Sequence, residues 1–208
     1  MKKLIKLIFV SHIVILFLLV PVLSFTQDMD SLWGVWNDNN QPDTSRLNAA
    51  DKLLYQGYYK KAFSSDSVLR LSDDMYGFAL NKGLMKFQSE ALKYLGNTQR
   101  FQYKIDEAYE SFVKRLSVCE QMNDKKGLAE TYMNLGFIYT YREKNEEALN
   151  SYLKSLKFYR ETKDSIRMGY LFNHIGFEYM YNGNFELSRA YQDSSMMIWE
   201  NRKQESIS

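Results

Sequence analysis

The amino-acid sequence predicts an all-α protein, built as an α-solenoid of antiparallel helix hairpins. From about residue 44 to residue 204, apolar residues recur at intervals of three and four, and no segment alternates with period two for long enough to indicate a strand. A second observation is a repeat. Residues 134–152 read NLGFIYTYREKNEEALNSY and residues 174–192 read HIGFEYMYNGNFELSRAYQ, which is the same skeleton after 40 residues. A fixed period of this size is typical of a solenoid.

Length and composition fit one ordinary domain with a nearly neutral surface. The chain has 208 residues, and 15% of them are aromatic, which is too many for a disordered chain. After residue 26 there are 24 Lys and Arg against 25 Asp and Glu, and no basic run, so we expect no nucleic-acid binding. Cys119 is the one cysteine, which excludes an internal disulfide. Its helical context favours a small buried hydrophobe over a reactive thiol.

Residues 1–26 are predicted to be a secretory signal peptide. A lysine-rich start precedes a run of Leu, Ile, Val and Phe, then Pro21 and small or polar residues. Cleavage after Thr26 would leave Gln27 first. The alternative is an uncleaved membrane anchor, since about 19 apolar-leaning residues follow Lys6. Polar residues and the proline interrupt that run and favour cleavage. In either case we expect export, to the periplasm or cell envelope of a bacterium.

The rest of the chain divides into a lead-in and four hairpins. Residues 27–43 are rich in turn formers and are predicted to be an irregular lead-in that docks by Trp33 and Trp36. Residues 44–86 are predicted to form a degenerate helical hairpin. Three better-defined repeats follow, at about 88–126, 127–166 and 167–204, with a short tail at 205–208.

The repeat holds its period at several registers. Each copy has a glycine preceded by Leu or Ile, with a small residue twelve positions later. These residues are Leu95 and Gly96 with Ala108, Leu135 and Gly136 with Ala148, and Ile175 and Gly176 with Ser188. We expect the glycine and the small residue to let two helices approach closely, although a glycine inside a helix costs about 1 kcal/mol relative to alanine. Rings such as Tyr139, Tyr152 and Tyr179 would fill the space around this crossing.

These residues resemble the tetratricopeptide repeat. The second copy carries the resemblance best, with Leu135-Gly136, Tyr139, Ala148, Tyr152 and Ser155 at the family's spacing. The first copy departs from it at Gln99 and Arg115, where the family has a tyrosine and a small residue. The resemblance implies a right-handed superhelix. Because the period is 40 rather than about 34 residues, we expect a longer second helix and a longer linker. Such a variant is similar to exported repeat arrays of bacterial sensor and regulatory proteins.

In this family the first helices of successive hairpins line a concave groove. Carried over by register, the candidate groove residues are Lys93, Asn97, Arg100, Glu130, Met133, Asn134, Phe137, Tyr170, Asn173, His174 and Phe177. Their mixture of aromatic, methionine and amide groups suits an extended or helical peptide. The alternative is that they are ordinary exposed or half-buried positions of a helical surface.

Some members of the family clamp a C-terminal carboxylate. They use a Lys and an Asn on one first helix, an Asn on the next, and two basic residues on the third. Lys93, Asn97 and Asn134 match the first three places, but Tyr170 and His174 stand at the two basic ones. The positive half of the clamp is therefore depleted.

Catalysis and metal binding find little support in the sequence. His174 is the one histidine after the N-terminal segment, and no second metal ligand lies three or four residues from it. No phosphate-binding loop, nucleophile elbow or Cys/His motif is present. We therefore expect a non-catalytic protein without metal or cofactor. An enzyme whose site the sequence does not reveal is the alternative.

Two binding functions are consistent with these features. The first is an exported scaffold that binds a protein or peptide, and the second is the extracytoplasmic, N-terminal part of a signalling protein of the histidine kinase or transcriptional regulator type. The last predicted helix, ELSRAYQDSSMMIWENRKQ, has no polar capping face. We therefore expect its apolar side near Trp199 to pack against a second copy, a partner or a further domain, and a charge at Ile198 to disperse any dimer.

Overall fold

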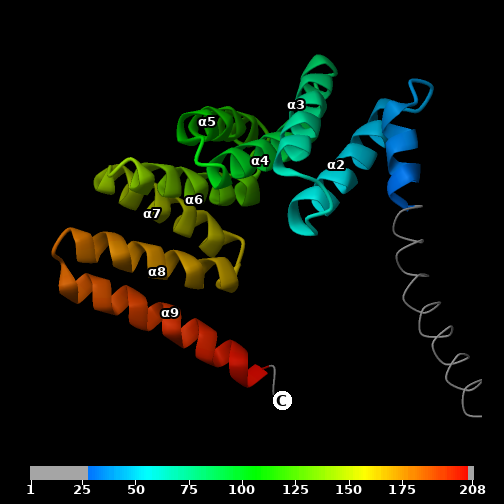
Figure 1. Cartoon of the computed structure of the whole chain (residues 1–208). Coiled ribbons are helices and arrows are strands. Elements are labelled where there is room, and N and C mark those ends of the chain that lie inside the picture. The colour runs from blue at the N-terminus through cyan, green and yellow to red at the C-terminus, as the bar shows by residue number, and fades with distance from the viewer. Residues whose placement is uncertain (1–27, 206–208) are drawn as a thin grey trace, which may run out of the picture. The chain divides into compact units, whose positions relative to one another are not determined.

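The computed structural model describes residues 28–205, in which all regular structure is α-helical (Figure 1). The predicted signal peptide at 1–26 and the last three residues of the predicted tail lie outside this range. The chain divides into two compact units, one up to Phe63 and one from Ser64 onward. Between residues 28 and 205, every helix is too short or too polar to span a lipid bilayer.

The first unit contains a short helix at 28–37 and helix α2 (Asp43–Tyr59). The lead-in, which we predicted to be irregular, is therefore largely helical. Both of its indoles make contacts within this unit: the Trp33 ring lies 5.9 Å from that of Phe63, and the buried Trp36 accepts a hydrogen bond on its backbone oxygen from Arg46 Nε at 2.9 Å. These contacts hold the short helix to α2 and to the end of the unit.

The second unit is a row of helices in which each packs against the next along the chain, as Figure 1 shows most clearly for α6 to α9. The helices are α3 (Ser65–Asn81), α4 (Met85–Phe101), α5 (Ile105–Gln121), α6 (Lys125–Tyr141), α7 (Asn145–Glu161), α8 (Ser165–Tyr181) and α9 (Phe185–Glu205). Consecutive helices begin 20 residues apart, which produces the period of 40 for a hairpin. The first helices α4 and α6 also contact each other directly.

The extra length of this repeat is shared between its two helices. We expected it in the second helix and the linker, relative to the usual period of about 34 residues. Instead, α3 to α8 each contain 17 residues, and every connection from α3 to α9 has three. That prediction was wrong because the turn geometry fixes the length of the connection.

Each of these turns places one residue in the left-handed region of backbone conformation. At Gly183 the φ angle is +74°, but Glu143 and Lys163 take the same conformation with φ of +57° and +56°. The next amide then donates back to the preceding helix, as from Lys144 N to Tyr139 O at 2.9 Å, in the pattern of a Schellman motif. The same bond closes every turn from α3 to α9, so each helix ends at the same place in its module.

The hairpin predicted over residues 44–86 is divided between the two units. Helix α3 begins 40 residues before α5 and packs against α4, where Ala79 O accepts a hydrogen bond from Gln88 Nε2 at 3.3 Å. It therefore takes the place of a second helix at the start of the array. Helix α2 is followed by residues 60–64, a longer connection than the three-residue turns, and the 20-residue spacing is lost there.

The glycines of the first helices lie against the rings of the second helices. A Cβ added at Gly136 would overlap the ring of Tyr152, and one added at Gly96 would lie 2.9 Å from the ring of Phe112. At Gly176 it would lie 3.1 Å from a backbone oxygen of α9. The crossing therefore depends on glycine. The ring sixteen positions later, rather than the small residue twelve positions later, is what the glycine meets in the first two copies.

The other predicted packing residues surround these crossings. Leu135, Ile175, Ala108, Ala148 and Ser188 are buried, while Leu95, Tyr139 and Tyr179 are half-buried. The core also continues between hairpins, because Tyr159 of α7 packs in one cluster with Leu171 and Ile175 of α8. Each hairpin thus covers an apolar face that its neighbour would otherwise expose to water.

Replacing Gly136 with alanine tests the close crossing. Overpacking a buried site costs about 1–3 kcal/mol, and alanine gains roughly 1 kcal/mol in helix propensity, so we expect a net loss of about 1–2 kcal/mol in the free energy of unfolding. Gly77 is the matched control, because it lies on the exposed face of α3 with nothing within 4 Å of an added Cβ. Urea denaturation should show Gly77→Ala to be neutral or stabilising. Equal effects of the two variants would contradict the account.

Candidate functional site

A hollow of about 360 Å³ opens between the first helices of the second and third repeats. It is lined by Phe137, Thr140 and Tyr141 of α6, Tyr152 of α7, and His174, Phe177, Glu178 and Tyr181 of α8. Three of the predicted groove residues, Phe137, His174 and Phe177, meet in its walls. The rest of the lining comes from residues that were assigned to packing or not singled out.

Glu178 is a buried carboxylate in the wall of this hollow. Its exposed fraction is 2%, and its Oε1 accepts a hydrogen bond from Thr140 Oγ1 at 2.6 Å. Its Oε2 has no hydrogen-bond partner among residues 28–205. The Tyr152 hydroxyl lies 3.2 Å from Thr140 Oγ1, and burial raises the pKa of this tyrosine, so the hydroxyl keeps its proton and donates toward the threonine. A hydrogen-bonded chain from Tyr152 through Thr140 thus ends at the carboxylate.

The position of Glu178 in the repeat is normally a core position. The residues at the same register are Thr98 in the first copy and Ile138 in the second, with exposed fractions of 4% and 0%. A carboxylate at a register that is buried in the other copies is the signal that would have identified this residue. Sequence analysis missed it because we treated that position of the skeleton as variable.

His174 forms part of the wall and shows no sign of a catalytic partner. Its ring stacks at 5.6 Å on the Tyr152 ring and lies edge-on to Phe137 at 4.7 Å. Burial, with a smaller contribution from the Arg100 charge, lowers the pKa of His174, so the imidazole is neutral at neutral pH. Arg100 stacks over the Phe137 ring at 5.1 Å. In the part of the chain that the structure describes, no three His, Cys, Asp or Glu side chains are grouped to hold a metal ion.

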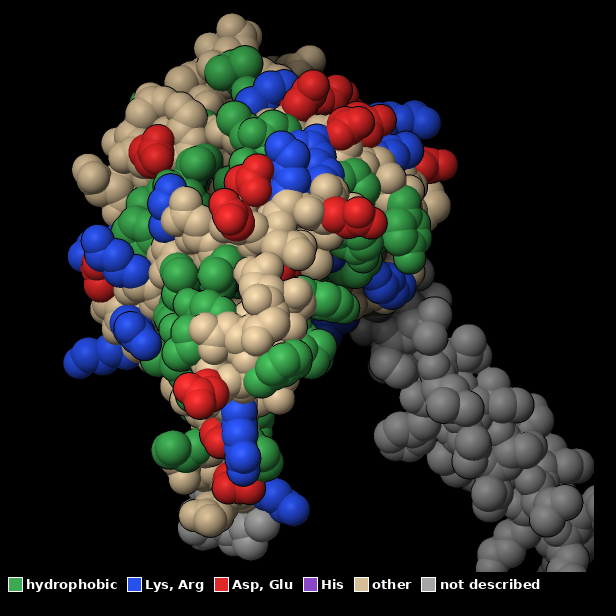
Figure 2. All heavy atoms as spheres, turned by 90° about the vertical axis from the view of Figure 1, so that its left-hand side faces the viewer, with side chains coloured by type: hydrophobic (Ala, Val, Ile, Leu, Met, Phe, Trp, Pro, Cys, Tyr) green, Lys and Arg blue, Asp and Glu red, His purple; other side chains and the backbone are tan. Residues whose placement is uncertain are grey.

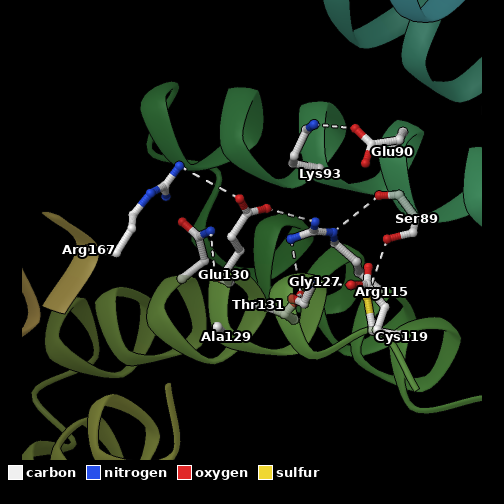
Figure 3. Close-up of polar contacts among 12 residues, drawn as sticks. Ser89, Glu90, Lys93, Arg115, Cys119, Gly127, Ala129, Glu130, Thr131 and Arg167 are labelled. Carbon is white, nitrogen blue, oxygen red and sulfur yellow. Dashed lines mark hydrogen bonds and ion pairs between the residues drawn. The ribbon is translucent and has the colours of Figure 1, made fainter. Parts of the chain in front are cut away.

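Arg115 is a second buried charged group, and its role is structural. The second copy has Ser155 at this register, whose Oγ donates to Ala129 O at 2.6 Å. Arg115 Nε makes the corresponding bond to Ser89 O at 3.2 Å, although the side chain is so much larger (Figure 3). The arginine thus keeps the helix–helix hydrogen bond of the small residue that it replaces.

The guanidinium of Arg115 also reaches into the next repeat. Its Nη1 donates to Thr131 Oγ1 at 3.1 Å and its Nη2 to Glu130 Oε2 at 3.0 Å. The other carboxylate oxygen of Glu130 lies 3.6 Å from Arg167 Nη2 of α8, so one carboxylate links three helices, as Figure 3 shows. Glu130 was predicted to be a groove residue, but both of its oxygens are engaged within the protein.

The residues that matched a carboxylate clamp are largely occupied. Lys93 forms an ion pair with Glu90, and Asn134 is buried with its Nδ2 donating to the backbone oxygen of Glu130 at 2.9 Å. The prediction that Asn134 faces a ligand was therefore wrong, because its side chain folds back onto its own helix. Of the other predicted groove residues, Asn97 and Met133 are half-buried, and Tyr170 and Asn173 are exposed outside the hollow.

The last helix covers its own tryptophan. The Trp199 ring lies 4.9 Å from Tyr170, and both Ile198 and Trp199 lie against Gly169 of α8. The expectation that these two residues are uncovered was therefore wrong. The apolar side chains of α9 that are exposed are Leu187, Met196 and Met197. Self-association through this helix stays a prediction, which light scattering of a Met197→Glu variant tests better than a charge at Ile198.

Removing the Arg115 guanidinium should destabilise the array. Breaking a buried ion pair by deleting one partner costs about 3–5 kcal/mol, and we expect the lower end for Arg115→Met because Arg167 still faces Glu130. The control is Lys125→Met, which removes an ion pair with Glu161 at the surface and should leave the melting temperature nearly unchanged. Thermal unfolding of both variants is the measurement. A loss for Arg115→Met no larger than the control's would contradict this role.

Comparisons with known proteins agree with this architecture. The model of the tetratricopeptide repeat family matches residues 128–162, which lie in α6 and α7. The crystal structure of BtubC (BKLC) from P. vanneervenii superposes with a TM-score of 0.72 at 15% sequence identity, over 86% of this chain and 72% of that one. The apo form of RapI superposes with a TM-score of 0.69 at 14% identity, over 78% of this chain and 45% of RapI.

This chain therefore spans less than half of RapI. No curated protein matches the sequence. At these identities the structural similarity concerns the fold alone. The family model adds the assignment of the central hairpin. Residues 128–162 are thus a tetratricopeptide repeat, and the chain is a helical solenoid of the tetratricopeptide-repeat kind.

Proposed function

We propose that this protein is a non-catalytic scaffold that binds a protein or peptide partner along its first helices, α4, α6 and α8. The observation that carries the proposal is the hollow between α6 and α8 with exposed rings at its edge. Tyr141, Phe177 and Tyr181 line it and are 53%, 41% and 69% exposed. Aromatic side chains left in water around a concavity are typical of recognition surfaces, where they bury a large apolar area on binding.

The exposed rings continue along the array at the repeat period. Phe101, Tyr141 and Tyr181 are the last residues of the three first helices, and each is more than half exposed. Tyr103 adds an edge-on contact with Tyr141 at 6.3 Å. The face in Figure 2, which is the side of the turn between α8 and α9, carries hydrophobic side chains among Lys, Arg, Asp and Glu of both signs. This mixed surface favours a protein or peptide over a polyanion.

The absence of a catalytic role is part of the proposal. His174 is held neutral between two rings, and the buried Arg115 is engaged by three acceptors. Glu178 has no nucleophile or second carboxyl group beside it in the lining of the hollow. The repeat fold supports interaction with other proteins in general. A sensor that uses the same groove as its input site is the alternative, and it would show the same binding.

We also propose that the protein is exported, on the strength of the order of residues in the N-terminal segment. Expression of the whole chain in a bacterium and N-terminal sequencing of the product test this proposal. The expected mature terminus is Gln27, recovered from the periplasmic fraction. A product that keeps residues 1–26 and stays in the membrane fraction would support the uncleaved anchor. A cytoplasmic product with Met1 would contradict export altogether.

A peptide library displayed on phage tests the binding function. We expect selection on the purified protein to enrich peptides whose affinity falls at least tenfold in the Phe177→Ser variant, because a central aromatic contact typically dominates an interface. Val113→Ser on α5 is the control, since Val113 is also exposed (42%) but lies on a second helix. Enrichment no greater than on an unrelated helical protein, or equal affinity of both variants, would contradict the groove as the binding site.

A further inference from the structure

We infer that the hollow between α6 and α8 receives a basic side chain, lysine or arginine, of the bound peptide. This inference rests on the proposed function of the groove and specifies the chemistry of its ligand. It is carried by the free carboxylate oxygen of Glu178 together with the aromatic walls around it.

The electrostatic part of the argument concerns the burial of Glu178. A carboxylate that is 98% buried with a hydrogen bond to one of its oxygens is costly to hold in a protein interior unless a positive charge joins it. Thr140 occupies Oε1, which leaves Oε2 open toward the hollow that Glu178 lines. His174, also in the lining, is neutral, and Arg100 stacks over Phe137 without lining the hollow. The lining itself therefore has a carboxylate and no cation.

The aromatic part of the argument concerns the shape of the site. Five of the eight lining residues have phenyl or phenol rings, from Phe137, Tyr141, Tyr152, Phe177 and Tyr181. Ring faces attract an ammonium or guanidinium group and pack against the aliphatic stem that carries it. A volume of about 360 Å³ is at the small end for ligand pockets, which suits one side chain rather than a folded segment.

Two observations favour a peptide side chain over a free amine. The rings of Tyr141 and Tyr181 extend from the hollow onto the exposed surface, where they offer contacts to the residues that flank an inserted side chain. The row of rings continues to Phe101 on α4, outside the hollow. A free amine would use the hollow alone and leave these rings in water.

The repeat also explains why this site occurs between one pair of helices. At the register of Glu178 the preceding first helix has Ile138, which is fully buried and carries no charge. The position between α4 and α6 therefore lacks the carboxylate, although it has the same backbone. One basic residue, rather than a row of them, is the expected requirement in the partner.

The experiment uses fluorescence anisotropy on peptides selected by the groove. For each peptide, the basic residue is replaced by norleucine, which keeps the stem and removes the charge. We expect the lysine or arginine form to bind the wild-type protein about ten- to a hundredfold more tightly, and Glu178→Gln to abolish that difference. The matched control is Glu186→Gln, an exposed residue of α9, which should leave the preference intact. The melting temperature of Glu178→Gln should be equal to or above that of the wild type, since glutamine keeps the Thr140 contact without a buried charge.

The outcomes separate this inference from the proposed function. Peptides that depend on Phe177 but bind equally well with norleucine would overturn the basic side chain and leave the groove standing. A preference for lysine that survives in Glu178→Gln would also overturn it. Butylamine or lysine amide, titrated alone, should bind at least a hundredfold more weakly than the peptide. Equal affinity of the free amine would overturn the peptide as the source. A library that yields no Phe177-dependent peptide would overturn both proposals.

Discussion

The close approach of paired helices is the contact on which the array from α3 to α9 depends. A glycine on the first helix lets the ring of the second lie against the backbone, at Gly136 with Tyr152 and at Gly96 with Phe112. Helices held this near can be joined by a three-residue turn, and the turn closes through a left-handed residue and one hydrogen bond back to the helix. The result is a 20-residue module that repeats without drift. Each hairpin leaves an apolar face that the next one covers.

A strict repeat makes its own exceptions informative. Where one register has the same environment in each copy, a residue of a different kind must either reproduce the usual contact or serve another purpose. Arg115 reproduces the contact of the small residue and adds a link to Glu130 in the next repeat. Glu178 does not reproduce the core contact of Ile138, because it places a carboxylate oxygen without a partner beside a hollow. The first exception stabilises the array, and the second marks the site at which we propose that it binds.

Much of the fold could be predicted from the sequence, because helical periodicity and the recurrence of the glycine both follow from packing that is local to a hairpin. The division of the repeat into equal helices could not, since a period of 40 says nothing about where a turn falls. Glu143 and Lys163 carry no sequence sign of the left-handed conformation that they adopt. In the site, register correctly brought Phe137, His174 and Phe177 together. It misplaced Asn134, because the direction of a side chain on its helix depends on contacts that one sequence does not show.

A crystal structure of the protein with a bound lysine-containing peptide tests the central claim most directly. The claim is that the hollow between α6 and α8 is where a partner is recognised. The predicted result is a lysine Nζ within roughly 3 Å of Glu178 Oε2, surrounded by the rings of the hollow, with the peptide backbone running past Tyr141 and Tyr181. A peptide bound elsewhere, for example with its C-terminal carboxylate at Lys93 and Asn97 and the hollow left empty, would contradict it.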